Sequence, residues 1–188
     1  MKRDLALECL KAHVTEDDIV VAVYQTCFDW LVLNPRDLNY VATGAMGQAS
    51  SHGLGLALAN PDRRVVVFDG DGSLLMNLGS LVTVAEAQPE NFHHFLFFNG
   101  VYEVNGAHPI PGKDTVDFQG MALAAGYRSA ESFTELTSLE KNVAGILDAP
   151  GPTFTELRVE PGAAYPRDYA YIHSSEARER FRQALNRG

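Results

Sequence analysis

Two short apolar runs constrain the fold of this chain more than any other feature. The clearer run covers residues 64–68, where β-branched side chains follow one another without polar alternation, and the second covers residues 92–98. Such runs are typical of parallel strands, because helices cover both faces of the sheet. Helical patterns alternate with these runs along the chain. The sequence therefore predicts an α/β fold: a doubly wound parallel sheet of about five or six strands with helices on both faces.

The other expected elements follow the same alternation. Further strands are expected at residues 19–23 and 38–41, near Tyr127, and at 153–159. Helices are expected at residues 5–14, 47–59, 73–87, 117–125, 131–147 and 174–186. Residues 100–113 hold three glycines and two prolines, which predicts a long loop. No Gly/Ser/Pro linker divides the chain, so we expect a single domain over residues 1–188, with 161–188 as a C-terminal helical tail.

The charge balance limits the partners that this chain is expected to bind. It has 15 Lys and Arg against 24 Asp and Glu, a net charge of −9, and no basic stripe, which argues against nucleic acid. Charged or polar residues limit the longest apolar stretches, and the first residues leave no room for a signal-peptide core, so we expect a cytoplasmic protein without membrane contact. Cys9 and Cys27 fit neither a disulfide framework nor a metal site. His93 and His94 lack further ligands at metal spacing, and an edge position is expected for both.

Chemically distinctive residues follow two of the expected strands. The run Asp69-Gly70-Asp71-Gly72-Ser73 comes directly before an expected helix, whose first N–H groups favour an anion. Its glycines allow close approach of the backbone to a ligand, and Asp71 offers the hard oxygen that Mg²⁺ prefers. Asn99 follows the next strand and adds an amide oxygen. Taken alone, these residues also fit an ordinary tight turn and a left-handed strand end.

Together, Gly70-Asp71-Gly72 and Asn99 resemble the cofactor motif of thiamine-diphosphate-dependent enzymes. In that family, Gly-Asp-Gly is followed by Asn-Asn after the next strand; here Phe98 replaces the first of the two asparagines. Thr43-Gly44-Ala45-Met46-Gly47 also matches. The resemblance covers most of residues 15–160 and is to the pyrophosphate-binding half of phosphonopyruvate and sulfopyruvate decarboxylases, which implies the thiamine-diphosphate-binding fold.

The resemblance implies roles for individual residues. Asp71, the side chain of Asn99 and the carbonyl of Val101 would hold Mg²⁺, and Gly72 and Ser73 would meet the diphosphate through their N–H groups. The carbonyl of Gly44 would bond the aminopyrimidine, and Met46 would wedge the cofactor into its bent shape, although a core methionine is the common alternative. The full set of implied cofactor contacts is Gly44, Ala45, Met46, Gly70, Asp71, Gly72, Ser73, Asn99, Val101 and Tyr102.

The same resemblance implies decarboxylation of a small 2-oxo acid, with release of CO₂ and an aldehyde. The glutamate that activates the cofactor in this family lies on a pyrimidine-binding domain, for which 188 residues leave no room. A separate pyrimidine-binding subunit of similar size is therefore expected as partner. Within the loop, Glu103 and His108 are candidate proton relays, with plain solvation as the alternative for each.

Three other functions remain open from the sequence. A carboligase subunit of the acetolactate synthase type shares the early chemistry of the decarboxylase. A non-catalytic module that binds the cofactor for regulation would keep Asp71 and Asn99 without turnover. A flavodoxin-like nucleotide binder would show no dependence on thiamine diphosphate.

Overall fold

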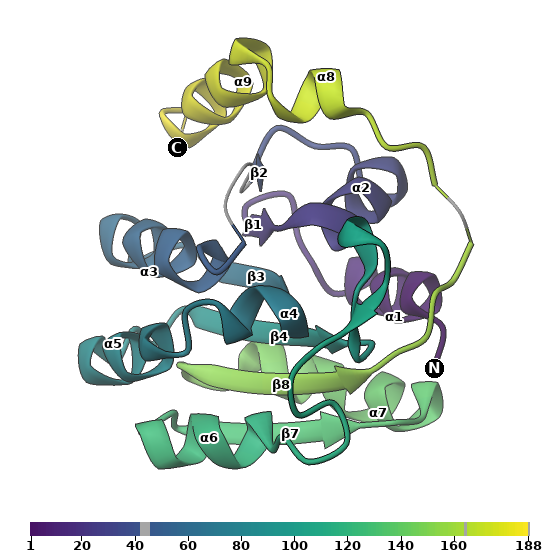
Figure 1. Cartoon of the computed structure of the whole chain (residues 1–188). Helices are drawn as coiled ribbons and strands as arrows, with labels where there is room; N and C mark the ends of the chain where they lie inside the picture. Colours follow the sequence, from purple (N-terminus) through teal and green to yellow (C-terminus); the bar gives the residue numbers. More distant parts are fainter. Residues whose placement is uncertain (42–45, 164, 188) are drawn as a thin grey trace.

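The computed structural model describes residues 1–41, 46–163 and 165–187, and its centre is a parallel sheet (Figure 1). The six strands run in the order β2-β1-β3-β4-β8-β7, and every neighbouring pair is parallel. Their bounds are β1 Ile19–Ala22, β2 Asn39–Val41, β3 Val65–Gly70, β4 Phe92–Phe98, β7 Ser129–Phe133 and β8 Thr153–Arg158. The predicted doubly wound α/β fold is therefore confirmed.

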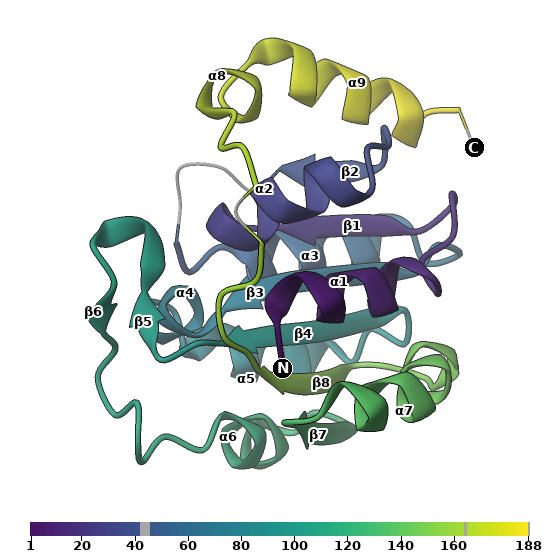
Figure 2. The same ribbon diagram turned by 90° about the vertical axis from the view of Figure 1, so that its right-hand side faces the viewer.

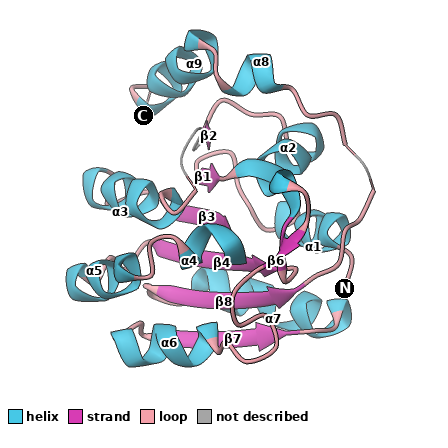
Figure 3. Cartoon of the chain, in the orientation of Figure 1, coloured by secondary structure: helices cyan, strands magenta, loops and turns pink. Residues whose placement is uncertain are grey.

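Helices cover both faces of the sheet (Figures 1 and 3). One face packs against α1 (Arg3–Lys11), α2 (Tyr24–Leu33) and α7 (Leu136–Asp148). The other face packs against α3 (Ala49–Ala59), α4 (Asp71–Leu75), α5 (Gly79–Ala87) and α6 (Phe118–Ala125). None of the helices in these described residues is both long and apolar enough to cross a membrane.

Side chains of β3 alternate between two apolar cores. Val65 and Val67 lie in the core beneath α3 and α5, whereas Val66 and Phe68 lie in the core beneath α1 and α2. All four are fully buried. A strand covered on both faces has no solvent-facing row, which explains why residues 64–68 show no polar alternation.

The C-terminal segment packs along the β2 edge of the sheet. It forms α8 (Tyr169–Ile172) and α9 (Ser175–Leu185), the second of which contacts β2. The ring of Phe181 in α9 meets the ring of Tyr40 edge to face, with centroids 5.1 Å apart. Figure 2 shows this segment passing from the end of β8 to the opposite edge of the sheet.

Two expected helices are wrong in their extent. The expected helix at 73–87 is two helices, because the backbone makes tight turns at 76–78 and the Asn77 amide donates to the Gly47 carbonyl at 2.9 Å. The expected helix at 131–147 begins only at Leu136, since residues 129–133 form β7. A helix was also missed: α2 is buried against the sheet over residues 26–30, and a mostly apolar helix shows little amphipathic periodicity.

The expected edge position of His93 and His94 is also wrong. Both lie in β4, a central strand, and are buried. Nδ1 of His93 lies 3.0 Å from the Thr153 hydroxyl, and Nε2 of His94 lies 3.4 Å from Asp69 Oδ2. Nδ1 of His94 also lies 3.3 Å from the Tyr127 hydroxyl, so each ring has one hydrogen-bond partner, as a buried polar side chain requires.

Two glycines of α3 provide a matched test of its packing. A Cβ on Gly53 would collide with the Val67 side chain and approach the Phe92 ring to 3.0 Å, whereas a Cβ on Gly55 meets nothing within 4 Å. Gly53→Ala is expected to lower the free energy of unfolding by about 1–3 kcal/mol through overpacking. Gly55→Ala is expected to raise it by about 0.5–1 kcal/mol through helix propensity. Urea unfolding of the two variants checks both signs; equal effects would contradict this packing.

The buried imidazole of His93 predicts acid sensitivity. Burial is the main cause that lowers its pKa from 6.5 to about 4, and the nearby Arg64 adds to the effect. The unfolded chain therefore takes up this proton first, and stability is lost as pH falls from about 6.5 toward about 4, by about 3 kcal/mol in all. His93→Gln is expected to flatten this part of the profile. Urea unfolding at several pH values measures it, and identical slopes in both proteins would refute the assignment.

Candidate functional site

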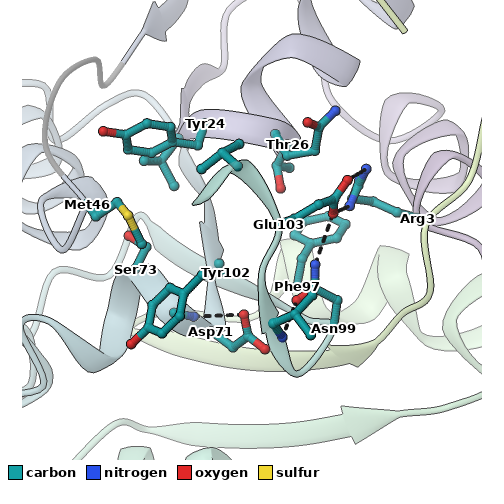
Figure 4. Close-up of a pocket in the computed structure, with 16 residues that line it drawn as sticks. Arg3, Tyr24, Thr26, Met46, Asp71, Ser73, Phe97, Asn99, Tyr102 and Glu103 are labelled. Atoms are coloured by element: carbon teal, nitrogen blue, oxygen red, sulfur yellow. Dashed lines mark hydrogen bonds and ion pairs between the residues drawn. The ribbon is translucent and has the colours of Figure 1, made fainter. Parts of the chain in front are cut away.

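A pocket opens at the carboxyl ends of β1, β3 and β4 (Figure 4). This is the switch point of the sheet, because β2 and β3 lie on opposite sides of β1. The pocket contains about 460 Å³ of empty space, including solvent at its mouth. Its lining residues are Arg3, Val23, Tyr24, Gln25, Thr26, Met46, Gly70, Asp71, Gly72, Ser73, Phe97, Asn99, Val101, Tyr102, Glu103 and Val104.

Asp71 is the first residue of α4 and directly follows β3. Its side chain is held by two backbone donors: Oδ1 accepts from the Gly72 N–H at 2.7 Å, and Oδ2 accepts from the Gly100 N–H at 2.6 Å. Burial raises the pKa of Asp71 to about 6, against the opposing effect of these hydrogen bonds. A nearby cation would favour the charged form of this desolvated carboxylate.

Asn99 lies beside Asp71 because β4 ends next to β3. Gly100, which donates to Asp71, has a left-handed backbone with φ +77°, the conformation that glycine adopts most easily. The side chain of Asn99 is oriented at both ends: Oδ1 accepts from the Val101 N–H at 2.9 Å, and Nδ2 donates to Glu103 Oε2 at 3.0 Å. The structure thus brings Asp71, Asn99 and Val101 to one side of the pocket.

Close packing surrounds Gly72 and Ser73 at the start of α4. A Cβ on Gly72 would lie 2.5 Å from the ring of Tyr102, so this position has room only for glycine while the ring stays there. The hydroxyl of Ser73 accepts from the Gly47 N–H at 2.9 Å. This bond ties the loop before α3 to the start of α4.

Met46 lines the pocket from the opposite side, and its sulfur accepts a hydrogen bond from the Asn105 side chain at 3.7 Å. The predicted contacts Gly44 and Ala45 lie outside the described residues. Met46 therefore lies at the pocket wall, whereas a core methionine would be enclosed by apolar side chains.

The expected loop at 100–113 contains a small hairpin. Its strands are β5 (Val101–Tyr102) and β6 (His108–Pro109), with the short helix η1 (Glu103–Asn105) between them. Glu103 and Tyr102 line the pocket, while His108 is exposed on β6 opposite Tyr102. The two candidate proton relays therefore lie in different environments, one inside the pocket and one on the hairpin surface.

Several polar residues of this pocket were not predicted from the sequence, above all Arg3. Arg3 is 3% exposed, and its guanidinium binds both Asp29 and Glu103. One signal was present: Arg3 precedes Leu7 and Leu10 by four and seven residues, so a cation lies on the apolar face of α1. Its partners come from α2 and η1, which no local pattern connects.

The donor set at Asp71 fits a hard cation such as Mg²⁺. It offers a buried carboxylate and an amide oxygen, and Mg²⁺ binds few protein ligands and keeps water or phosphate oxygens in its other positions. Residues 1–41, 46–163 and 165–187 contain no cluster of three or more His, Cys, Asp or Glu side chains suited to a metal. A site built from one carboxylate, one amide and one backbone carbonyl would not form such a cluster.

Comparison with known proteins finds one matching family and several similar enzymes. The family "Thiamine pyrophosphate enzyme, C-terminal TPP binding domain" matches residues 24–157. A phosphonopyruvate decarboxylase from Streptomyces viridochromogenes is 38% identical over 181 residues, which cover 96% of this chain and 45% of that protein. Sulfopyruvate decarboxylase subunit beta from Methanocaldococcus jannaschii is 38% identical over 144 residues, which cover 75% of this chain and 76% of that subunit. The chain thus spans less than half the length of the phosphonopyruvate decarboxylase.

A solved structure from Mycobacterium smegmatis, described as a thiamin diphosphate-dependent enzyme, shares the fold. Its TM-score is 0.72 at 23% identity, over 86% of this chain and 32% of that one. The family match covers well over half of the chain, and the resemblance predicted from Gly70-Asp71-Gly72 and Asn99 is confirmed. The chain belongs to the thiamine pyrophosphate enzyme family, as a C-terminal TPP-binding domain.

Proposed function

We propose that this chain is the pyrophosphate-binding half of a thiamine-diphosphate-dependent decarboxylase that acts on a small 2-oxo acid. The observation that carries the proposal is the buried Asp71 carboxylate beside Asn99, at the switch point of a TPP-binding domain. Relatives named phosphonopyruvate decarboxylase and sulfopyruvate decarboxylase subunit beta support the reaction class. The product would be CO₂ and an aldehyde.

In this proposal, Asp71, the Asn99 side chain and the Val101 carbonyl hold Mg²⁺, which neutralises the diphosphate. Gly70, Gly72 and Ser73 would bind the diphosphate at the start of α4, where a helix N-terminus favours an anion. Met46 and Tyr102 border the organic part of the cofactor. Bound thiamine diphosphate supplies the electron sink for loss of CO₂, and the chain supplies its orientation and charge neutralisation.

A pyrimidine-binding partner subunit of similar size completes the proposed enzyme. Two carboxylates line the described pocket, and both are engaged: Asp71 by backbone N–H groups and Glu103 by Arg3. In this proposal neither carboxylate takes the activating role, and the glutamate that activates the pyrimidine ring comes from the partner subunit. The relative from Methanocaldococcus jannaschii is itself named a subunit, which supports a split arrangement.

Proton transfer to the product is assigned to Glu103 or His108. His108 lies on the exposed hairpin, and Glu103 lies at the pocket, where Arg3 and Asn99 already bind its oxygens. His108→Ala in the complete enzyme separates the two, since a slower turnover assigns the relay to His108 and full activity removes it.

The reaction assignment is tested on the full chain purified with the subunits that accompany it. Magnesium and thiamine diphosphate are added, and CO₂ and aldehyde release are followed for sulfopyruvate, phosphonopyruvate and pyruvate. Aldehyde release is the expected result. A carboligated product in place of the aldehyde would establish the acetolactate synthase type, and cofactor binding without turnover would establish a non-catalytic module.

Removal of the Asp71 carboxylate is expected to abolish magnesium-dependent binding of thiamine diphosphate. Asp71→Ala loses the charge and both acceptors, for the Gly72 and Gly100 N–H groups, whereas Asp71→Asn loses the charge and one of the two acceptors. Binding of the cofactor is measured by calorimetry in excess Mg²⁺ and in a chelator. Asp114→Ala is the matched control, because that side chain is 82% exposed and lies in the neighbouring loop. Unchanged affinity in Asp71→Ala would overturn the metal assignment.

A further inference from the structure

Arg3 is the most deeply buried cation at the pocket. Its guanidinium side chain is 4% exposed, and Nε donates to Asp29 Oδ2 at 2.7 Å. Asp29 also accepts from the Gln25 side chain at 2.8 Å, so both donors to this carboxylate are fixed by α1 and α2. A desolvated cation of this kind must be paired, and breaking such a pair is costly.

The free edge of the guanidinium points at the hairpin loop (Figure 4). Nη1 donates to Glu103 Oε2 at 2.5 Å, and Nη2 donates to Glu103 Oε1 at 3.2 Å. This two-pronged contact fixes the position and the plane of the carboxylate, as a single Lys donor would not. Glu103 lies 100 residues from Arg3 in sequence, so tertiary structure alone creates the contact.

Glu103 in turn fixes the amide of Asn99. An ionised carboxylate only accepts hydrogen bonds, so it selects the Nδ2 end of the amide, 3.0 Å from Oε2. The Oδ1 end then lies on the other side, where it accepts from the Val101 N–H. Without Glu103, one of the two contacts that select this orientation is lost.

We infer that Arg3 and Glu103 are positioning residues that present the amide oxygen of Asn99 to a divalent cation. The inference rests on the proposed function, in which Asn99 is a magnesium ligand. The chain of contacts runs from Asp29 through Arg3 and Glu103 to Asn99, and it connects α1 and α2 to the end of β4. Residues that orient a metal ligand through hydrogen bonds typically contribute about 10–100-fold to metal affinity.

The test measures the affinity for Mg²⁺ at saturating thiamine diphosphate, on the full chain with the subunits that accompany it. Glu103→Ala is expected to weaken Mg²⁺ binding about 10–100-fold, and Glu103→Gln, which keeps an acceptor for Asn99, by a smaller factor. Arg3→Met is expected to weaken it in the wild-type background. In the Glu103→Ala background, Arg3→Met should have no further effect on affinity, since Arg3 acts through Glu103.

Two controls separate positioning from general destabilisation. Glu90→Ala removes an exposed carboxylate that also pairs with an arginine, Arg128, at 3.4 Å, and it should leave Mg²⁺ affinity unchanged. Backbone amide exchange, followed by NMR on the full chain without cofactor, should speed up at Val101 in Glu103→Ala, because this N–H bonds to Asn99 Oδ1. A merely structural role of Arg3 would lower stability and leave this exchange unchanged relative to its neighbours.

The outcomes distinguish the inference from the proposed function. If Asp71→Ala abolishes binding while Glu103→Ala and Arg3→Met retain wild-type affinity, the inference is overturned and the proposed function stands. Additive effects of Arg3→Met and Glu103→Ala would also overturn it. If the wild-type protein binds no thiamine diphosphate, the proposed function fails, and unchanged Val101 exchange would then overturn the positioning role independently.

Discussion

The parallel pairing of β3 with β4 is the constraint on which the rest of the site depends. Gly70 pairs with Phe97 at the end of this register, so the residues that leave the two strands emerge side by side. Asp71 and Asn99 therefore meet, although 28 positions separate them in the sequence. Because both faces of these strands are covered by helices, their ends are where polar groups of the two strands reach a pocket.

The carboxylate of Asp71 is buried in the protein, where its charged form is disfavoured. Burial raises the pKa of Asp71, and two backbone N–H groups stabilise its carboxylate only in part. A bound cation would stabilise the charged form of this carboxylate. The protein thus gains affinity for the cation at some expense of its own stability. The Asp29–Arg3–Glu103 network differs, because there the opposite charges are already paired inside the protein.

Much of the site was predictable from local sequence. The features that were not predicted depend on contacts between segments that are distant in the sequence. Asp71 and Asn99 each follow a recognisable buried strand, so strand positions alone predict that they meet. Arg3 lies far from both in sequence, and its contacts depend on how α1 packs across the sheet. The break between α4 and α5 depends on the contact of Asn77 with Gly47, which helix periodicity does not report.

The amino-acid sequence by itself determined the α/β class, the sheet of buried parallel strands, and the motif that identifies the family. These features are local, since apolar runs, glycine pairs and spacing are read from neighbouring residues. Only the tertiary structure decided which charges are paired, where the helices break, and that the two histidines lie in a central strand. Burial and hydrogen bonding between distant segments set these properties, and they arise only once the layers have packed.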